Sequence, residues 1–140
     1  MPRPSTLPRS KHVTDTTSPT RVLIVDDNVD GARSLARYLE IKGFEVTVRH
    51  DGHSGIEAAR ASRPDFALLD FVLPGMDGLE VARQLREDLG LSGCTLIGVS
   101  GFGPEDIRES DATRFDHFLV KPVDYAELLR LLNQPPAGEP

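Results

Sequence analysis

Short apolar runs alternate along the chain with segments of helical periodicity, and this alternation limits the possible folds more than any other feature. Runs rich in Val, Ile, Leu and Phe between polar segments are typical of β-strands. Several of them are apolar on both faces, as parallel strands covered by helices must be. The five runs are RVLIVDD (21–27), FEVTVRH (44–50), DFALLD (65–70), TLIGVS (95–100) and HFLVK (117–121).

Helical periodicity lies between these runs and after the last one. Five β-α units of this size predict an α/β fold, a doubly wound five-stranded parallel sheet with five helices and right-handed crossovers. Ligands of such folds bind beyond the carboxyl ends of the strands, so function is expected at that edge of the sheet. Apolar residues recur at helical spacing over 29–39, 56–59, 79–85 and 128–132, whereas 104–114 is poorly amphipathic.

The ends of the chain differ in composition from its middle. Residues 1–20 are rich in Pro, Ser and Thr and contain no apolar block, so we predict a disordered leader. Residues 21–133 are expected to form one domain, and residues 134–140 a flexible tail. No stretch approaches the ~20 apolar residues of a membrane span, and no signal-peptide core is present. We therefore predict a soluble, cytoplasmic protein with no membrane partner.

Charge and cysteine content limit the partners further. The net charge of −6 repels a phosphate backbone, so we expect no nucleic-acid binding by the body of the domain. The single cysteine, Cys94, excludes an internal disulfide and fits a reducing compartment. The four histidines share no spacing and have no cysteine companion, so a transition-metal site is not expected.

Acidic and basic residues stand where several of the apolar runs end. Asp26 and Asp27 follow the first run, Asp70 ends the third, and Lys121 ends the fifth. Two carboxylates ~4 Å apart repel by about 4 kcal/mol at an effective dielectric of 20, so either one acid binds a proton or a divalent cation lies among them. Mg²⁺ suits an all-oxygen cluster of this kind.

The same edge is expected to contain a hydroxyl, Ser100, at the end of the fourth run. An ammonium and a hydroxyl beside a metal-bound carboxylate are groups that would hold an incoming phosphoryl, and Asp70 would then be a nucleophile that forms an acyl phosphate.

Some of these acidic and polar residues also have a simpler structural interpretation. Asp27 or Asn28 alone would cap the first helix, and Asp77 in the turn PGMDG is interpreted as a local cap.

Four stretches, in this order, resemble the receiver domains of two-component response regulators. They are VLIVDDN, LLDFVLPGMDGLE, VSGFG and FLVKPVD, and the resemblance covers roughly residues 21–133. It implies the flavodoxin-like, CheY-like receiver fold, with 21–133 as the receiver domain. The SGFG and FLVKPVD stretches also resemble receivers that are fused to hybrid histidine kinases.

The resemblance implies a chemical role for each residue at the predicted site. Asp70 would be the phosphoacceptor, and Lys121 would contact the phosphoryl group. Asp26, Asp27, Asp70 and Val72 would form the Mg²⁺ site. The phosphoryl donor would be a histidine kinase or a phosphotransfer protein.

It also implies a conformational switch. Ser100 would be the hydroxyl switch residue, and Phe118 falls at the aromatic position whose ring turns inward when the hydroxyl moves. The family further suggests a cis peptide between Lys121 and Pro122, which would direct the lysine towards Asp70.

The sequence departs from the family pattern at several places. Val72 and Phe102 are apolar where the family often has polar residues that affect water attack on the acyl phosphate. Neither side chain can orient a water by hydrogen bonding, so we predict slow hydrolysis of the acyl phosphate.

Thr113 and Arg114 stand where the family commonly has Ala-Gly, and the segment after Ser100 is about one residue short. A shortened or irregular fourth helix is therefore expected.

The predicted function is a single-domain response regulator, because no output domain follows residue 133. It would signal by protein contact or phosphorelay and would not be an enzyme. An alternative is a docking or dimerisation module that works without phosphorylation, in which case a homodimer is a possible partner. A second alternative, an aspartate-nucleophile phosphatase, requires an Asp-x-Asp pattern after the first strand, and here Asn28 occupies its second acidic position.

Overall fold

A computed structural model describes residues 19–101 and 114–133 as a five-stranded parallel sheet with helices on both faces. The strand order is β2-β1-β3-β4-β5, and every neighbouring pair is parallel. Each predicted apolar run contains one strand. The strands are β1 (Arg21–Val25), β2 (Glu45–Arg49), β3 (Phe66–Asp70), β4 (Thr95–Ser100) and β5 (His117–Val120).

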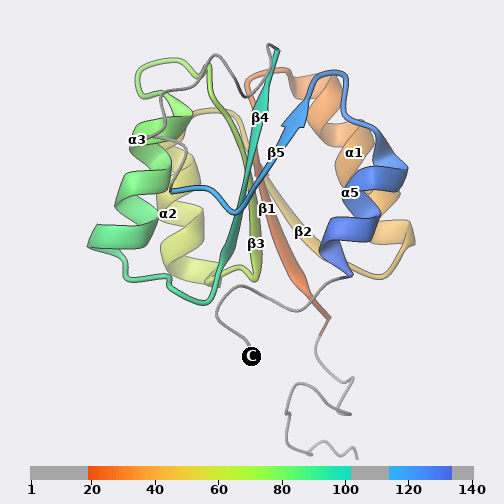
Figure 1. The fold of residues 1–140 in the computed structure, drawn as a ribbon, viewed down its shortest axis with the longest axis horizontal. Coiled ribbons are helices and arrows are strands. Elements are labelled where there is room, and N and C mark those ends of the chain that lie inside the picture. The colour runs from red at the N-terminus through yellow and green to blue at the C-terminus, as the bar shows by residue number, and fades with distance from the viewer. Residues whose placement is uncertain (1–18, 102–113, 134–140) are drawn as a thin grey trace, which may run out of the picture.

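The helices cover the sheet in two layers. Figure 1 shows α1 and α5 against one face and α2 and α3 against the other. The doubly wound fold is therefore confirmed, and four of the five predicted helices lie in the described residues. They are α1 (Val29–Ile41), α2 (Gly52–Ser62), α3 (Gly78–Arg83), which continues into the π-helical turn η1 (Gln84–Asp88), and α5 (Tyr125–Leu132).

Several predictions fall outside the described residues. The fourth helix was expected in the segment 102–113, and most of the predicted leader and all of the predicted tail lie in 1–18 and 134–140. Among residues 19–101 and 114–133, no helix is both long and apolar enough to cross a membrane.

The central strand β3 is buried along its whole length. Ala67 and Leu69 belong to the core beneath α2 and α3, whereas Phe66 and Leu68 belong to the core beneath α1 and α5. A parallel strand with a core on both faces must be apolar at successive positions, which explains the uninterrupted run FALL. The same burial continues to Asp70, whose residue exposure is only 5%.

Each described helix begins at a side-chain cap a few residues after a strand end. Asn28 Oδ1 accepts a hydrogen bond from Gly31 N–H at the start of α1, and Asp77 Oδ1 accepts one from Glu80 N–H at the start of α3. Asp51 and Asp124 cap α2 and α5 in the same way. These bonds satisfy backbone donors that a helix start leaves unpaired. The local capping role predicted for Asp77 is confirmed.

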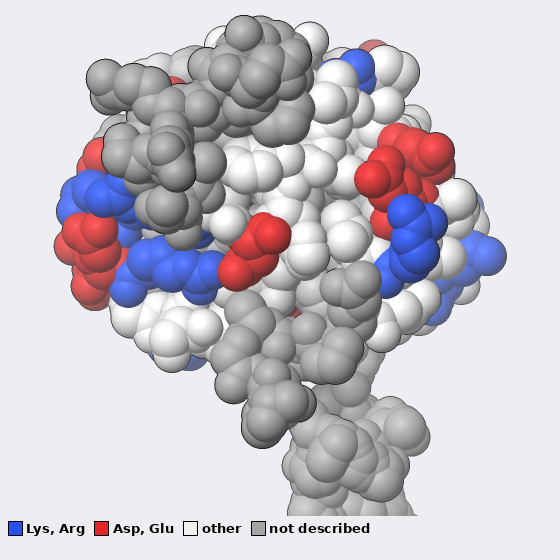
Figure 2. All heavy atoms as spheres, in the orientation of Figure 1, with Lys and Arg blue, Asp and Glu red and all other residues white. Residues whose placement is uncertain are grey.

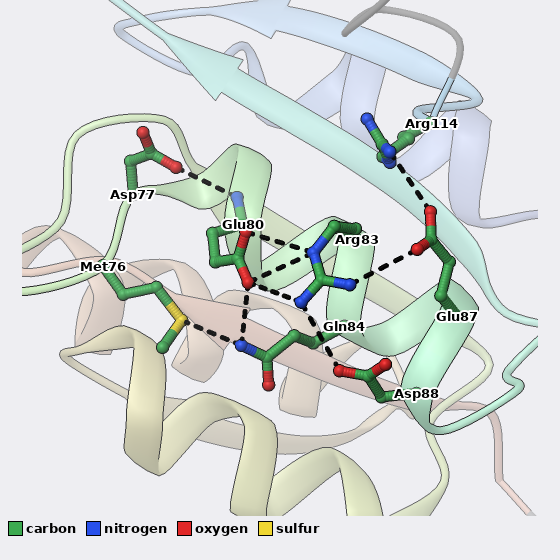
Figure 3. A network of polar contacts seen from close by, with 8 residues as sticks. All are labelled: Met76, Asp77, Glu80, Arg83, Gln84, Glu87, Asp88 and Arg114. Carbon is green, nitrogen blue, oxygen red and sulfur yellow. Dashed lines mark hydrogen bonds and ion pairs between the residues drawn. The ribbon is translucent and has the colours of Figure 1, made fainter.

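Charged side chains gather on the outer surface of α3 and η1, where Arg83 is the centre of a network (Figure 3). Its guanidinium pairs with Glu80 at 2.7 Å, with Glu87 at 3.3 Å and with Asp88 at 3.5 Å. Hydrogen bonds from Arg83 and then Gln84 lower the pKa of Glu80 to about 2. Glu87 also pairs with Arg114 at 3.1 Å, so the network joins α3 to the segment that leads into β5.

In the orientation of Figure 1, charged side chains lie over α3 and over α1 and α5, and the surface between them carries few charges (Figure 2). The uncharged part lies over the β5 edge of the sheet. β5 itself, HFLV, contains no Lys, Arg, Asp or Glu, and Val120 is 47% exposed.

The chain turns tightly between β3 and α3, and Gly78 makes this turn possible. Gly78 N–H donates to the Phe71 carbonyl at 3.1 Å, and a Cβ atom at position 78 would overlap the Asp70 carbonyl oxygen. Because that obstacle is backbone and cannot rotate away, only glycine fits here without moving the end of β3.

We expect Gly78→Ala to destabilise the domain by about 1–3 kcal/mol, because the added methyl displaces the backbone of Asp70. Urea unfolding of both proteins measures the difference. Gly93→Ala is the matched control, since a Cβ at position 93 meets no atom within 4 Å. Equal unfolding midpoints for the two variants would contradict the prediction.

Candidate functional site

The predicted site residues meet at the carboxyl edge of the sheet. Asp26 and Asp27 follow β1, and Asp70 is the last residue of the neighbouring strand β3. The three carboxylates offer ligand atoms that all lie within 4.8 Å of one another. The rule that parallel strands present their carboxyl ends on one edge therefore located this cluster correctly.

Lys121, just after β5, supplies positive charge to the cluster. Its Nζ lies 2.6 Å from Asp70 Oδ2 and 3.5 Å from Asp26 Oδ2. The Asp70 side chain is only 6% exposed, so this close pair compensates for the removal of the carboxylate from water. The Lys121–Pro122 peptide is cis, as the family resemblance implied.

Backbone donors fix the other carboxylate oxygens. Val72 N–H donates to Asp70 Oδ1 at 3.0 Å, and Asn28 N–H donates to Asp26 Oδ1 at 2.9 Å. Each of these two acids therefore has one oxygen bound by backbone and the other facing Lys121. The two donors come from the loops that immediately follow β1 and β3, so the same turns that begin the next helices also orient the acids.

His50 is a neighbour of the site that sequence reasoning did not assign to it. Its Nδ1 lies 2.9 Å from the Asp26 carbonyl oxygen, and Asp26 N–H donates to the Arg49 carbonyl at 3.0 Å. A carbonyl only accepts hydrogen bonds, so Nδ1 must carry a proton. The end of β2 thus holds the Asp26 peptide from both sides. The only sequence signal was the position of His50 directly after a strand.

The electrostatics of the cluster reflect burial and crowding. Burial raises the pKa of Asp26, and the nearby Asp70 raises it further, while the Asn28 hydrogen bond and Lys121 only partly oppose this. Burial alone would lower the pKa of Lys121, but its hydrogen bond to Asp70 and the charge of Asp26 outweigh burial and raise it. Lys121 therefore stays protonated, and the acids have an excess of negative charge.

The donor set fits Mg²⁺. Three carboxylates and one ammonium leave two uncompensated negative charges, and all the converging ligand atoms are oxygens. A hard divalent ion prefers such ligands and balances that charge. Asp26, Asp27 and Asp70 are the residues that would hold it. Val72 is 64% exposed and its N–H binds Asp70; its predicted part in the metal site stays a prediction.

The two predicted switch residues lie on neighbouring strands. Ser100 ends β4 and is 4% exposed, and its carbonyl accepts a hydrogen bond from Lys121 N–H at 2.8 Å. Phe118 on β5 is partly buried and packs against the core beneath α2 and α3. Phe102, the second apolar departure from the family pattern, lies outside the described residues.

The fold and the acid cluster together define a class: flavodoxin-like proteins with an acidic site at the carboxyl edge of a parallel sheet. A sequence model of one family in this class, described as "Response regulator receiver domain", matches residues 22–133. The chain therefore belongs to the response regulator receiver family, whose members are signalling domains of two-component systems.

Solved structures agree with this assignment. The chemotaxis response regulator CheY4 of Vibrio cholerae superposes with a TM-score of 0.75 at 27% identity, covering 82% of this chain and 97% of that one. A CheY-like receiver domain protein from Methanospirillum hungatei JF-1 gives a TM-score of 0.72 at 27% identity, covering 82% and 91% of the two chains.

Curated relatives are longer regulators. "Transcriptional regulatory protein PrrA" of Mycobacterium tuberculosis is 39% identical over 116 residues, which are 83% of this chain and 49% of PrrA. "Transcriptional regulatory protein CseB" of Streptomyces coelicolor is 53% identical over 60 residues, 41% of this chain and 25% of CseB. The chain thus spans about half or less of the length of these relatives. Neither name describes a hybrid kinase, so that part of the resemblance stays a prediction.

We expect Asp26→Asn to raise the melting temperature by a few degrees at neutral pH without Mg²⁺. The raised pKa of Asp26 means that its ionisation costs stability, a cost that is absent at low pH and complete once the pH exceeds that raised pKa. The gain should therefore disappear below about pH 4. Thermal unfolding in EDTA at both pH values measures it, and a variant less stable than wild type at neutral pH would contradict the prediction.

Proposed function

We propose that Asp70 accepts a phosphoryl group from a histidine kinase or a phosphotransfer protein. The observation that supports this most strongly is the buried Asp70 carboxylate, 2.6 Å from Lys121 and surrounded by two further acids. Asp26 and Asp27, with Asp70 and Val72, are proposed to hold Mg²⁺. When bound, the ion would neutralise charge on the acids and on the phosphoryl oxygens.

In the proposed reaction an Asp70 oxygen attacks the phosphorus of phosphohistidine. The bond between phosphorus and the histidine nitrogen breaks, that nitrogen keeps the electron pair, and Asp70 becomes an acyl phosphate. Val72 N–H fixes the rotation of the carboxylate by binding Oδ1, which limits the directions from which the donor can approach.

Lys121 changes its partner in this reaction. Before transfer its ammonium pairs with an Asp70 oxygen that carries part of a negative charge. Phosphorylation removes that charge from the carboxyl group and places more negative charge on the phosphoryl oxygens nearby. The ammonium should therefore bind the phosphoryl group, which would move the Lys121 backbone and, through it, the end of β4 at Ser100.

The signal is proposed to leave the domain by protein contact or by phosphorelay to another carrier. Membership of a signalling family and the intact set of acids and lysine support this proposal. A docking or dimerisation module that works without phosphorylation would not need a crowded acid cluster that raises the pKa of one of its members.

A small phosphodonor tests the phosphoacceptor role. Acetyl phosphate with Mg²⁺ should add one phosphoryl group to the wild-type protein, as measured by intact mass, because an activated phosphoryl replaces the kinase. Asp70→Asn should abolish the addition. Asp77→Asn is the matched control, because Asp77 belongs to the same loop but caps α3, a role that asparagine also fills. Labelling of the Asp70→Asn protein would place the nucleophile elsewhere.

We further expect slow loss of the phosphoryl group. Val72 is 64% exposed beside Asp70 and has no polar group to orient a water molecule. Val72→Asn should speed hydrolysis roughly tenfold, which is less than the roughly 10²–10⁴-fold of a positioned acid or base, because asparagine can orient a water molecule but cannot take its proton. Phosphate release after removal of the donor measures the rate. Ile41 is another exposed apolar residue, at the end of α1 and far along the chain from the site, so Ile41→Asn should leave the rate unchanged.

A wild-type half-life of seconds in the presence of Mg²⁺ would refute slow hydrolysis. So would equal decay rates for wild type and Val72→Asn, because they would mean that the side chain at this position does not affect access of water to the acyl phosphate.

A further inference from the structure

His50 follows β2 and binds the peptide group that joins the two adjacent acids of the site. Its Nδ1 donates a hydrogen bond to the Asp26 carbonyl at 2.9 Å. That carbonyl lies in one rigid plane with the nitrogen and the Cα atom of Asp27, because rotation about a peptide bond is strongly hindered. A donor that fixes the Asp26 carbonyl therefore also fixes the point from which the Asp27 side chain projects.

The His50 ring takes the place of a backbone donor in the ladder between β1 and β2. These parallel strands pair in register as far as Val25 and Arg49, and the Asp26 N–H then donates to the Arg49 carbonyl at 3.0 Å. A regular parallel ladder would continue with a bond from Asp51 N–H to the Asp26 carbonyl. The chain instead turns into α2 at Asp51, and the side chain of His50 supplies the donor.

Asp27 depends on its backbone more than the other two acids of the site do. Backbone N–H groups bind the carboxylates of Asp26 and Asp70, and Lys121 lies close to both. Asp27 is exposed, and among residues 19–101 and 114–133 no donor binds its carboxylate. One of its oxygens nevertheless lies within 4.8 Å of ligand atoms of the other two acids. Within this part of the chain, only the backbone keeps that oxygen at the site.

We propose that His50 is a positioning residue of the metal site. Its hydrogen bond orients the peptide between Asp26 and Asp27, and this orientation keeps the Asp27 carboxylate beside the other two acids. The proposal rests on the proposed function, because it takes a divalent cation as the ligand of the three carboxylates. His50 is not among the residues whose ligand atoms converge, so it acts on the ion through the backbone of a ligand.

The expected size of the effect follows from the kind of contact that His50 makes. Loss of a partner that orients a metal ligand typically lowers metal affinity by roughly 10–100-fold. His50 binds the backbone next to a ligand and not the carboxylate itself, and its ring is only partly buried, so water can replace some of the lost hydrogen bonding. We therefore expect the lower end of that range, a loss of about tenfold.

Binding of Mn²⁺, followed by the electron paramagnetic resonance signal of the free ion, tests the proposal. Mn²⁺ accepts the same oxygen ligands as Mg²⁺. His50→Leu removes the donor but keeps a branched side chain, and its affinity should fall about tenfold. His50→Asn has nearly the same shape as the leucine variant and places an amide N–H where Nδ1 was, so its affinity should stay close to that of wild type.

His53→Leu is the matched control. His53 lies in the first turn of α2 and is exposed, so this substitution removes an imidazole from the same region without removing the donor to the Asp26 carbonyl. Its Mn²⁺ affinity should equal that of wild type. An equal loss of affinity in His50→Leu and His50→Asn would overturn the proposal, because the hydrogen-bond donor would then not be the property that matters.

A double-mutant cycle tests the route through Asp27. Asp27→Asn alone should weaken Mn²⁺ binding, because it removes a charged oxygen ligand. If His50 acts by placing that ligand, His50→Leu should weaken binding much less in the Asp27→Asn protein than in wild type. Fully additive losses would mean that His50→Leu disturbs the site as a whole, and they would overturn the role assigned to His50.

Nitrogen NMR of the metal-free protein provides a measurement that needs no ion. At alkaline pH, where the ring is neutral, the nitrogen shifts of His50 should place the proton on Nδ1. A proton on Nε2 would overturn the proposal, since Nδ1 could not then donate to the Asp26 carbonyl.

The binding data also separate this proposal from the proposed function. If the wild-type protein does not bind Mn²⁺, the metal site of the proposed function fails and the role of His50 fails with it. If wild type binds Mn²⁺ and His50→Leu binds it equally well, only the role of His50 fails.

Discussion

The burial of the Asp70 carboxylate at the end of the central strand is the constraint on which the rest of the structure depends. β3 has a core on each face, so the strand must be apolar up to the residue at which it ends in an acid. A buried carboxylate is tolerated only with a charge partner and hydrogen bonds, and Lys121 and Val72 N–H provide these. Both partners come from the loops that follow strands, so the site exists only once the sheet has formed.

The crowding of acids around Asp70 lowers the stability of the folded domain. The raised pKa of Asp26 means that ionisation of this acid makes the folded protein less stable. Elsewhere among the described residues, acids such as Glu80 are paired with arginine, and the pKa of Glu80 is low for that reason. Acids that are fully paired at the surface but lack enough positive partners at one site are typical of a site that binds a charged ligand.

The strands and the acid cluster could be predicted from the sequence because both depend on local patterns. Apolar runs located all five strands, and the carboxyl-edge rule brought Asp26, Asp27, Asp70 and Lys121 together. The contacts that periodicity missed join residues far apart in the chain. His50 binds a backbone carbonyl of another loop, Arg114 pairs with Glu87 of η1, and Gly98 is needed only because two rings from other segments cross it. Side-chain packing of this kind leaves no period in the sequence.

The helix starts described above also have an electrostatic consequence. In a parallel sheet every helix must run back against the strands, so α1, α2, α3 and α5 all begin at the edge that carries the acids. The amino end of a helix bears a partial positive charge from its aligned peptide dipoles. The capping residues Asn28, Asp51, Asp77 and Asp124 stand at these ends, and three of them already place a carboxylate there. The topology itself therefore gives this edge a field that favours anions, carboxylate and phosphoryl alike.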